Sequence, residues 1–153
     1  MATPEERIAE LGLTLPEVVP PVAAYQPTVR SGAHVYVSGQ LPFVDGALPA
    51  TGKVGAEVSP ETAKELAAVC ALNAIAAVRA EVGDLSDVVR IVKVGGFVAS
   101  APEFTGHPGV INGASELLGE VFGPAGVHAR AAVGVASLPL DSPVEVDMIV
   151  EVR

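Results

Sequence analysis

The sequence has little of what several common kinds of functional site require. Its 153 residues include one cysteine, Cys70, no tryptophan and only 4% aromatic side chains. One cysteine excludes an intramolecular disulfide and a zinc site built from several thiolates. With so few aromatic residues the core must consist of Val, Leu, Ile and Ala. Because Cys70 lies in the middle of an apolar helical pattern, we expect its thiol to be buried and unreactive.

Positive charge is also scarce. Nine Lys and Arg stand against 18 Asp and Glu, which gives a net charge of −9. Nucleic acids and anionic membranes are bound by basic side chains, so neither kind of partner is expected. The uncharged stretch at residues 66–78 is shorter than the roughly 20 residues that span a bilayer. The acidic N-terminus does not resemble a signal peptide, so a cytoplasmic location is expected.

Half of the residues are apolar and 18% are charged, which is typical of a folded chain. The length fits one domain over residues 1–153, with residues 1–24 as an N-terminal extension packed on it. Residues 4–11 have a short helical pattern that ends at Gly12. The next residues, 13–27, are expected to lie extended over the surface, because four prolines interrupt them: Pro16, Pro20, Pro21 and Pro27.

The remaining chain alternates between strand and helix patterns. Ser59, Pro60 and the closing Gly83 define a long helix over residues 60–82. A second helix is predicted over residues 107–122. Strands are predicted at residues 28–30, 34–38, 87–100, 131–138 and 144–152, with a tight turn at residues 31–32 and a long loop at residues 41–58. This order predicts an α+β domain in which two helices cover one face of a mixed sheet.

The other face of that sheet is also expected to be covered. The predicted strands carry too many apolar side chains for one face to hold, and self-association is the economical way to cover the second. These side chains are Val92, Val94, Phe97, Val133, Val135, Val146 and Ile149.

Most candidate catalytic patterns are absent. The sequence has no phosphate-loop motif and no G-x-G-x-x-G fingerprint. His34, His107 and His128 are scattered without metal-ligand spacing, so surface or capping roles are expected and no metal site is predicted. Ser38 lacks the G-x-S-x-G surroundings of a nucleophile, and its hydroxyl is expected to form a hydrogen bond instead.

Arg130 and Glu145 form the most informative charged pair. Arg130 is the only basic residue between Lys93 and Arg153, and it begins a strand of small apolar residues. Glu145 begins the following strand, and a short connection is expected to bring both residues to one end of the sheet. A guanidinium in apolar surroundings suits a carboxylate ligand. The alternative is a solvated strand-end arginine paired with Glu145 or with an acid near the C-terminus.

Two segments carry a resemblance to a known family. Residues 35–42 (VYVSGQLP) resemble the (I/V)-x-x-S-G-Q-(I/L)-P signature of the YjgF/RidA family, also called endoribonuclease L-PSP. Residues 130–139 (RAAVGVASLP), followed by 144–147 (VEVD), resemble that family's C-terminal signature. The likeness covers about residues 25–153. It implies a chorismate-mutase-like homotrimer with active sites between subunits.

The resemblance also implies an activity and its residues. Well-known members hydrolyse reactive 2-imino acids, or their enamine tautomers, to 2-keto acids and ammonia, without a metal or organic cofactor. By resemblance, Arg130 binds the substrate carboxylate and Glu145 positions the attacking water. The family's substrate-binding positions also match Tyr25, Ser38, Gly39 and Asn112.

The chain departs from the common deaminases in two places. Ala132 stands where many of them have cysteine, and residues 99–127 form a longer segment than usual, so a divergent subgroup is indicated. Three functions remain open at this point. They are an imine or enamine deaminase, a non-catalytic binder of small carboxylates, and a weak ribonuclease or translation inhibitor, the last disfavoured by the charge.

Overall fold

The computed structural model describes residues 2–18 and 23–153, so the prolines predicted to be extended at positions 20 and 21 lie outside the described residues. The described chain forms three α-helices, three short 3-10 turns and five strands. The helices are α1 (Pro4–Glu10), α2 (Pro60–Val82) and α3 (His107–Phe122). The strands are β1 (Thr28–Ser31), β2 (His34–Gln40), β3 (Val88–Ala99), β4 (Ala129–Val135) and β5 (Val144–Val152).

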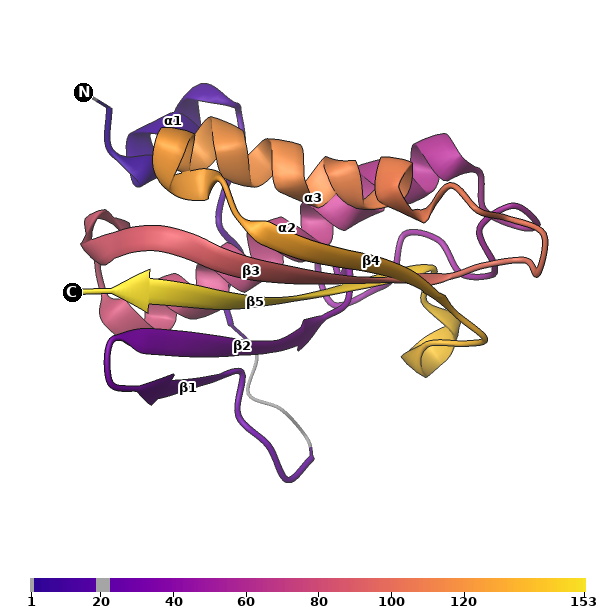
Figure 1. Cartoon of the computed structure of the whole chain (residues 1–153), viewed down its shortest axis with the longest axis horizontal. Helices are drawn as coiled ribbons and strands as arrows, with labels where there is room; N and C mark the ends of the chain where they lie inside the picture. The colour runs from indigo at the N-terminus through magenta and orange to yellow at the C-terminus, as the bar shows by residue number, and fades with distance from the viewer. Residues whose placement is uncertain (1, 19–22) are drawn as a thin grey trace.

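The five strands form one mixed sheet in the order β1-β2-β5-β3-β4 (Figure 1). Neighbours are antiparallel except β3 and β4, which run parallel and are joined through α3. The C-terminal strand β5 is therefore central and pairs with β2 on one side and β3 on the other. Strand β4 lies at one edge, with no neighbour on its outer side among the described strands.

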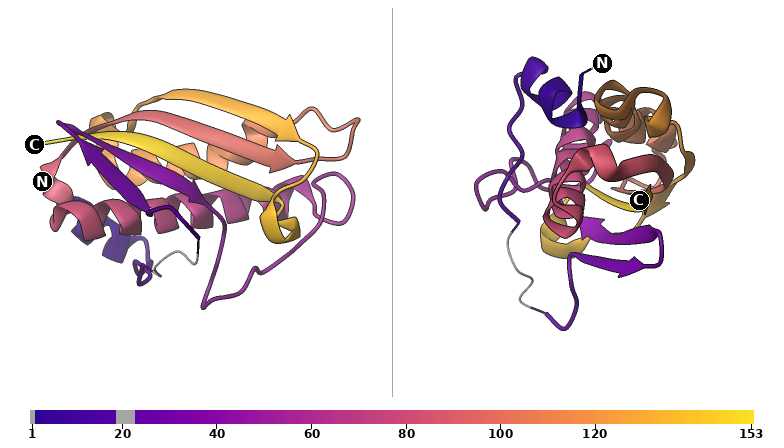
Figure 2. Two further views of the ribbon diagram at one scale, coloured as in Figure 1. Left: turned by 90° about the horizontal axis from the view of Figure 1, so that it is seen from below. Right: turned by 90° about the vertical axis from the view of Figure 1, so that its left-hand side faces the viewer.

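Helices α2 and α3 pack side by side against one face of this sheet, which gives the two layers seen in Figure 2. The core between the layers is aliphatic, as the composition required, and Cys70 is fully buried within it, as predicted. Burial raises the pKa of the Cys70 thiol. The predicted α+β fold with two helices on one face of a mixed sheet is confirmed.

Helix α2 has the bounds that its sequence predicts. Ser59 caps its N-terminus, where the Ser59 Oγ accepts a hydrogen bond from the Thr62 backbone N–H at 3.1 Å. Gly83 ends the helix with φ +85°, a conformation that L side chains rarely adopt. Other bounds differ slightly from the prediction. Helix α1 ends at Glu10, and β4 runs over Ala129–Val135 because the chain leaves the β3 ladder after Val135.

The N-terminal helix α1 packs beside α3. Thr3 caps it through a reciprocal pair of bonds with Glu6. Its Ile8 side chain is 3% exposed and belongs to the main core. The Glu5 Oε1 atom also accepts a hydrogen bond of 2.8 Å from the Leu85 backbone N–H. No helix of the described residues has the length and apolar character needed to cross a membrane.

Helices α2 and α3 approach closely at Gly113. A Cβ on Gly113 would overlap the backbone carbonyl oxygen of Lys64 on α2. Because a backbone atom cannot move aside cheaply, we expect Gly113→Ala to destabilise the fold by about 1–3 kcal/mol. Gly119 on the same helix has open space at its Cβ position, so Gly119→Ala is the matched control and should be neutral or stabilising. Chemical denaturation of both variants tests this, and equal stability would contradict the close packing.

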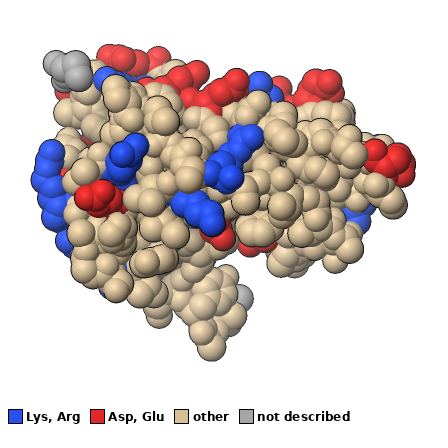
Figure 3. All heavy atoms as spheres, viewed as in Figure 1, with Lys and Arg blue, Asp and Glu red and all other residues tan. Residues whose placement is uncertain are grey.

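The second face of the sheet bears no helix in the described structure. Tyr36 and Val133 on this open face are 48% and 44% exposed. Apolar side chains do point to both faces, as predicted, since Val94 and Val146 belong to the core on the helix side. Figure 3 shows this side of the molecule as largely uncharged, with a few basic groups near its middle and acidic groups along its upper rim.

Candidate functional site

Arg130 lies on the edge strand β4 and points to the helix side of the sheet. Its register partner on β3 is Val94, which is fully buried in the core. The Arg130 Nη1 atom donates to the Asn112 Oδ1 atom at 2.8 Å and to the Ser115 Oγ atom at 3.2 Å, both on α3. Its Nη2 atom donates a longer bond of 3.5 Å to the Pro108 carbonyl. The guanidinium is therefore held by uncharged partners, which leaves its charge available to an anion.

Glu145 lies on the central strand β5 and points to the open face. It alternates with the buried Val144 and Val146, and its register partner on β3 is Phe97. Its carboxylate packs directly on Gly39 of β2, where a Cβ would overlap the Oε1 atom. Gly39 lies in a bulge of the β2–β5 ladder between Val37 and Gln40. A residue without a side chain is therefore needed to leave room for this carboxylate.

The expected proximity of Arg130 and Glu145 within one chain is wrong. Strand β3 lies between β4 and β5, and the two side chains point to opposite faces of the sheet. The short connection after β4 crosses over β3 instead of forming a hairpin. The alternative that Arg130 pairs with Glu145 is wrong for the same reason, and its recorded partners are Asn112, Ser115 and Pro108.

The remaining predicted residues divide between these two places. Asn112 lies with Arg130, whereas Ser38 and Gly39 lie with Glu145. The Ser38 hydroxyl donates a 2.5 Å hydrogen bond to the Gln26 carbonyl, so it does form a hydrogen bond as expected. This bond ties the segment that holds Tyr25, which is 55% exposed, to strand β2. One chain thus presents an arginine half-site and a glutamate half-site.

The glutamate half-site contains a second acid that we did not predict. Asp147 follows Glu145 at strand spacing and points to the same open face, a period-2 signal that the sequence does contain. Burial raises the pKa of Glu145, and the charge of Asp147 raises it further. Burial also raises the pKa of Asp147, although the backbone N–H of Gly95 and the charge of Lys93 oppose that effect. Glu145 therefore holds its proton to higher pH than an ordinary glutamate.

A raised carboxyl pKa makes a prediction for stability. Between the ordinary glutamate pKa and the raised one, the folded state binds more protons than the unfolded state, so the free energy of unfolding falls as pH rises. Glu145→Gln removes the cost of keeping an ionised carboxylate partly buried and should therefore raise the melting temperature at pH 7. The gain should shrink as the pH falls below the ordinary carboxyl range. Melting curves from pH 4 to 8 test this, with Glu120→Gln on the exposed side of α3 as control, and a gain that grows at low pH would contradict it.

The arginine half-site also contains residues that the sequence reasoning missed. Ser115 follows Asn112 by three positions on α3, so both face Arg130, and helical spacing alone could have indicated this. The His128 Nε2 atom lies 2.9 Å from the Ser115 Oγ atom. The sequence gave no such indication for His128, which lies two residues before Arg130, because its contact with Ser115 depends on the path of the turn before β4.

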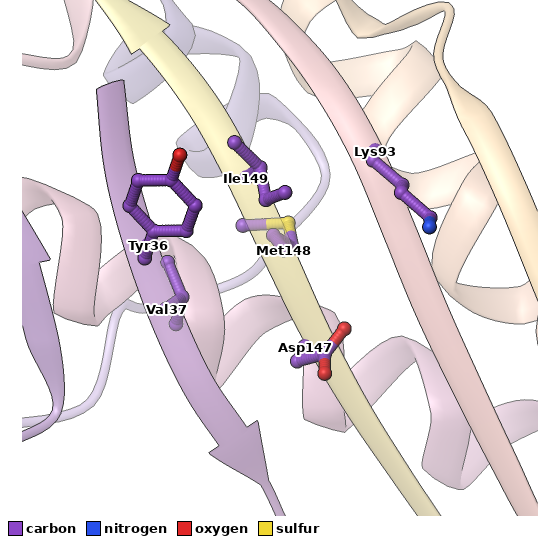
Figure 4. Close-up of a pocket in the computed structure, with 6 residues that line it drawn as sticks. All are labelled: Tyr36, Val37, Lys93, Asp147, Met148 and Ile149. Carbon is purple, nitrogen blue, oxygen red and sulfur yellow. The ribbon is translucent and has the colours of Figure 1, made fainter. Parts of the chain in front are cut away.

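Two shallow depressions on the surface include neither Arg130 nor Glu145, although the first reaches Asp147 of the glutamate half-site. One, of 240 Å³, crosses three strands of the open face, and Figure 4 shows Tyr36, Ile149, Lys93 and Asp147 around it. The other, of 370 Å³, holds His107, whose Nε2 atom lies 3.2 Å from the Ser100 hydroxyl. Neither brings Arg130 and Glu145 together. In the described part of the chain, no three His, Cys, Asp or Glu side chains are grouped as metal ligands.

Comparisons with known proteins agree with this fold. A family model described as "YjgF/chorismate mutase-like, putative endoribonuclease" matches residues 5–152. Protein TCP17 of Trypanosoma cruzi is 44% identical over 147 residues, which are 95% of this chain and 92% of TCP17. The crystal structure of Atu1372 from Agrobacterium tumefaciens is 49% identical with a TM-score of 0.92, covering 99% of this chain and 94% of that one. The chain belongs to the YjgF/chorismate mutase-like family.

A more distant structure is that of RidA from the Antarctic bacterium Psychrobacter sp. It is 28% identical with a TM-score of 0.60, covering 88% of this chain and 94% of its own. The predicted family is thus confirmed, and this chain is structurally nearer to Atu1372 than to that RidA.

Proposed function

We propose that this protein hydrolyses small 2-imino acids to 2-keto acids and ammonia, with Arg130 as the carboxylate clamp and Glu145 as the group that activates water. The observation that carries the proposal is the arginine half-site. There a half-buried guanidinium is held by neutral oxygen atoms and has no acidic partner among the described residues. A planar cation held in this way suits the carboxylate of a small acid. The resemblance to the YjgF/RidA family, whose well-known members act on 2-imino acids, supports the same substrate class.

The reaction requires positioning and proton transfer more than strong activation. Glu145 accepts a proton from water while the water oxygen bonds to the electrophilic imine carbon. Glu145 returns this proton to the imine nitrogen, which gives the carbinolamine. Glu145 then takes the hydroxyl proton and passes it to the amino group, so that the C–N bond breaks, ammonia leaves and the hydroxyl carbon becomes the keto group. Water is the only other reactant. Because the pKa of Glu145 is raised, the carboxylate is a better base than an ordinary glutamate while the pH remains high enough to ionise it.

The two half-sites can serve one substrate only across a subunit boundary. Arg130 points to the helix side of one sheet and Glu145 to the open side, so a single chain cannot place both around one small molecule. A homotrimer meets this requirement if it covers the open faces, including Tyr36 and Val133, and brings the edge strand β4 of one subunit, with Arg130, beside the open face of its neighbour. In that assembly Asn112 and Arg130 come from one subunit, and Tyr25, Ser38, Gly39 and Glu145 from its neighbour.

Assembly is directly measurable. Light scattering or sedimentation at micromolar concentration should give three times the 15.5 kDa chain mass. A stable monomer under these conditions would contradict both the covered open face and the shared site.

The activity is tested with a panel of 2-imino acids generated in place by an amino-acid oxidase. Semicarbazide traps the imine that remains, so a deaminase lowers the semicarbazone signal and releases keto acid faster. If no imine in the panel is hydrolysed faster than without the protein, the proposal is wrong. A parallel assay incubates RNA with protein that has been purified free of host nuclease. Degradation of the RNA would favour the ribonuclease hypothesis despite the net charge of −9.

A further inference from the structure

A chain of three hydrogen-bonding contacts lies behind Arg130. The Arg130 Nη1 atom donates to the Ser115 Oγ atom at 3.2 Å, and that oxygen lies 2.9 Å from the His128 Nε2 atom. On the other side of the imidazole ring, the His128 Nδ1 atom lies 2.6 Å from the Gly126 carbonyl oxygen. The chain thus links β4, α3 and the turn that precedes β4.

When the imidazole of His128 is neutral, the partners fix the direction of each hydrogen bond from Arg130 to Gly126. A carbonyl oxygen can only accept, so the His128 Nδ1 atom carries the hydrogen that points to Gly126. In the neutral imidazole the Nε2 atom is then an acceptor, and the Ser115 hydroxyl must donate to it. The lone pairs of Ser115 are left to accept from Arg130. The orientation of the serine hydroxyl is therefore set by the tautomer of His128.

The Gly126 carbonyl, which accepts the last hydrogen bond of the series, is held in place by tight backbone packing. Gly126 is buried, and a Cβ at this position would overlap the carbonyl oxygen of Leu118 on α3. The turn that supplies the Gly126 carbonyl is therefore pressed against the helix that supplies Ser115. The Gly126 end of the hydrogen-bond series is thus packed on α3, the helix that carries Ser115 in the middle of the series.

The hydrogen bonds to α3 and to the Pro108 carbonyl determine which edge of the Arg130 guanidinium is free. Arginine has five N–H groups, and the two on Nη1 point to Asn112 and Ser115. One on Nη2 points to Pro108. The Nε–H and one Nη2–H remain without a partner in the described structure. The Nε–H and the Nη2–H beside it form one edge of a guanidinium, which matches the two oxygens of a carboxylate, and the long 3.5 Å contact to Pro108 is the only recorded bond of Nη2.

We propose that Ser115 and His128 are positioning residues, which hold Arg130 so that its Nε and Nη2 edge meets the substrate carboxylate. The choice of a substrate carboxylate as the ligand rests on the proposed function, whereas the positioning of Arg130 by Ser115 and His128 does not. In this account Ser115 fixes the rotation of the guanidinium, and His128 fixes Ser115. Neither residue touches the reacting atoms.

The test has one readout that is independent of activity. Nitrogen-15 NMR should show His128 as the Nδ1–H tautomer and the Arg130 Nε–H as rigid. Ser115→Ala should make the Arg130 Nε–H more mobile, and Ser115→Thr, which keeps the hydroxyl, should restore its rigidity. The exposed Ser137→Ala is the matched control. An Nε2–H tautomer, or an Arg130 equally rigid in Ser115→Ala, would overturn the inference.

The second readout is affinity for pyruvate and 2-oxobutanoate, measured by calorimetry. Ser115→Ala and His128→Ala should each weaken binding about 10-fold, and Ser115→Thr should recover most of the loss. Normal binding by Ser115→Ala would overturn the positioning role. If the parent protein binds neither keto acid, the proposed function fails, and the NMR result alone then decides whether Ser115 holds Arg130.

Discussion

Replacing Arg130 by alanine should remove almost all turnover and leave the fold and the assembly intact. The guanidinium lies on the edge strand, bonded only to neutral oxygens, so its loss breaks no buried ion pair. The charge-assisted bonds it would make to a substrate carboxylate are worth on the order of 2–4 kcal/mol. Activity should therefore fall about 30- to 1000-fold. Values of kcat/KM from the imine assay measure the effect, and circular dichroism and light scattering check that the protein is otherwise unchanged.

Lysine at this position separates charge from geometry. An ammonium group keeps the positive charge but cannot make the paired contact of a guanidinium edge, so Arg130→Lys should recover little activity. Arg79→Ala, an exposed arginine at the end of α2, is the matched control and should behave as the parent. If Arg130→Ala is as active as the parent, Arg130 is only a strand-end residue and the clamp is excluded.

Replacing Glu145 by glutamine should remove hydrolysis but not binding. Glutamine keeps the shape of the side chain above Gly39 and loses the ability to take a proton from water. Loss of a general base costs typically 10²–10⁴-fold in rate. We expect kcat to fall within this range, while the affinity for a keto-acid product stays near that of the parent. Stopped assays of ammonia release, together with calorimetry on the same preparation, separate the two effects.

Glu151→Gln is the matched control for that variant, because Glu151 lies on the same strand and points to the same face as Glu145. Its turnover should equal that of the parent. A protein that binds 2-keto acids but hydrolyses no imine, with or without Glu145, is a carboxylate-binding protein. That outcome would support the clamp and reject the catalytic part of the proposal.

Most of the fold could be predicted from local signals. Ser59 and Gly83 carry the chemistry that starts and ends a helix, so α2 was placed without error. The end of β4 was less accurate, because residues 136–138 continue an apolar pattern although they no longer have a ladder partner on β3. A strand end of this kind depends on the partner strand, which a local pattern does not describe.

The geometry of the site could not be predicted from local patterns, because it depends on the order of the strands in the sheet. Arg130 and Glu145 begin consecutive strands, and a short connection favours a hairpin between them. The chain instead inserts β3 between β4 and β5, which separates the two residues, and the register of each strand on β3 points their side chains to opposite faces. The sequence did predict apolar residues on both faces of the sheet, and it therefore predicted that self-association covers the second face. It missed Ser115, although the three-residue spacing from Asn112 could have indicated it, and it missed His128, whose contacts with Ser115 and Gly126 exist only once α3 packs beside β4.

Mixed oligomers of two inactive variants test the central claim most directly. Arg130→Ala subunits keep Glu145, and Glu145→Gln subunits keep Arg130, so trimers that contain both variants regain an intact site wherever the two meet in the right order. Two-tag purification after co-expression should isolate such trimers, and a closed ring with both kinds of subunit has about one intact site in three. The account predicts that these trimers recover about one third of the parent activity, although each variant alone is inactive. Mixed trimers as inactive as the single variants would contradict a site shared between subunits.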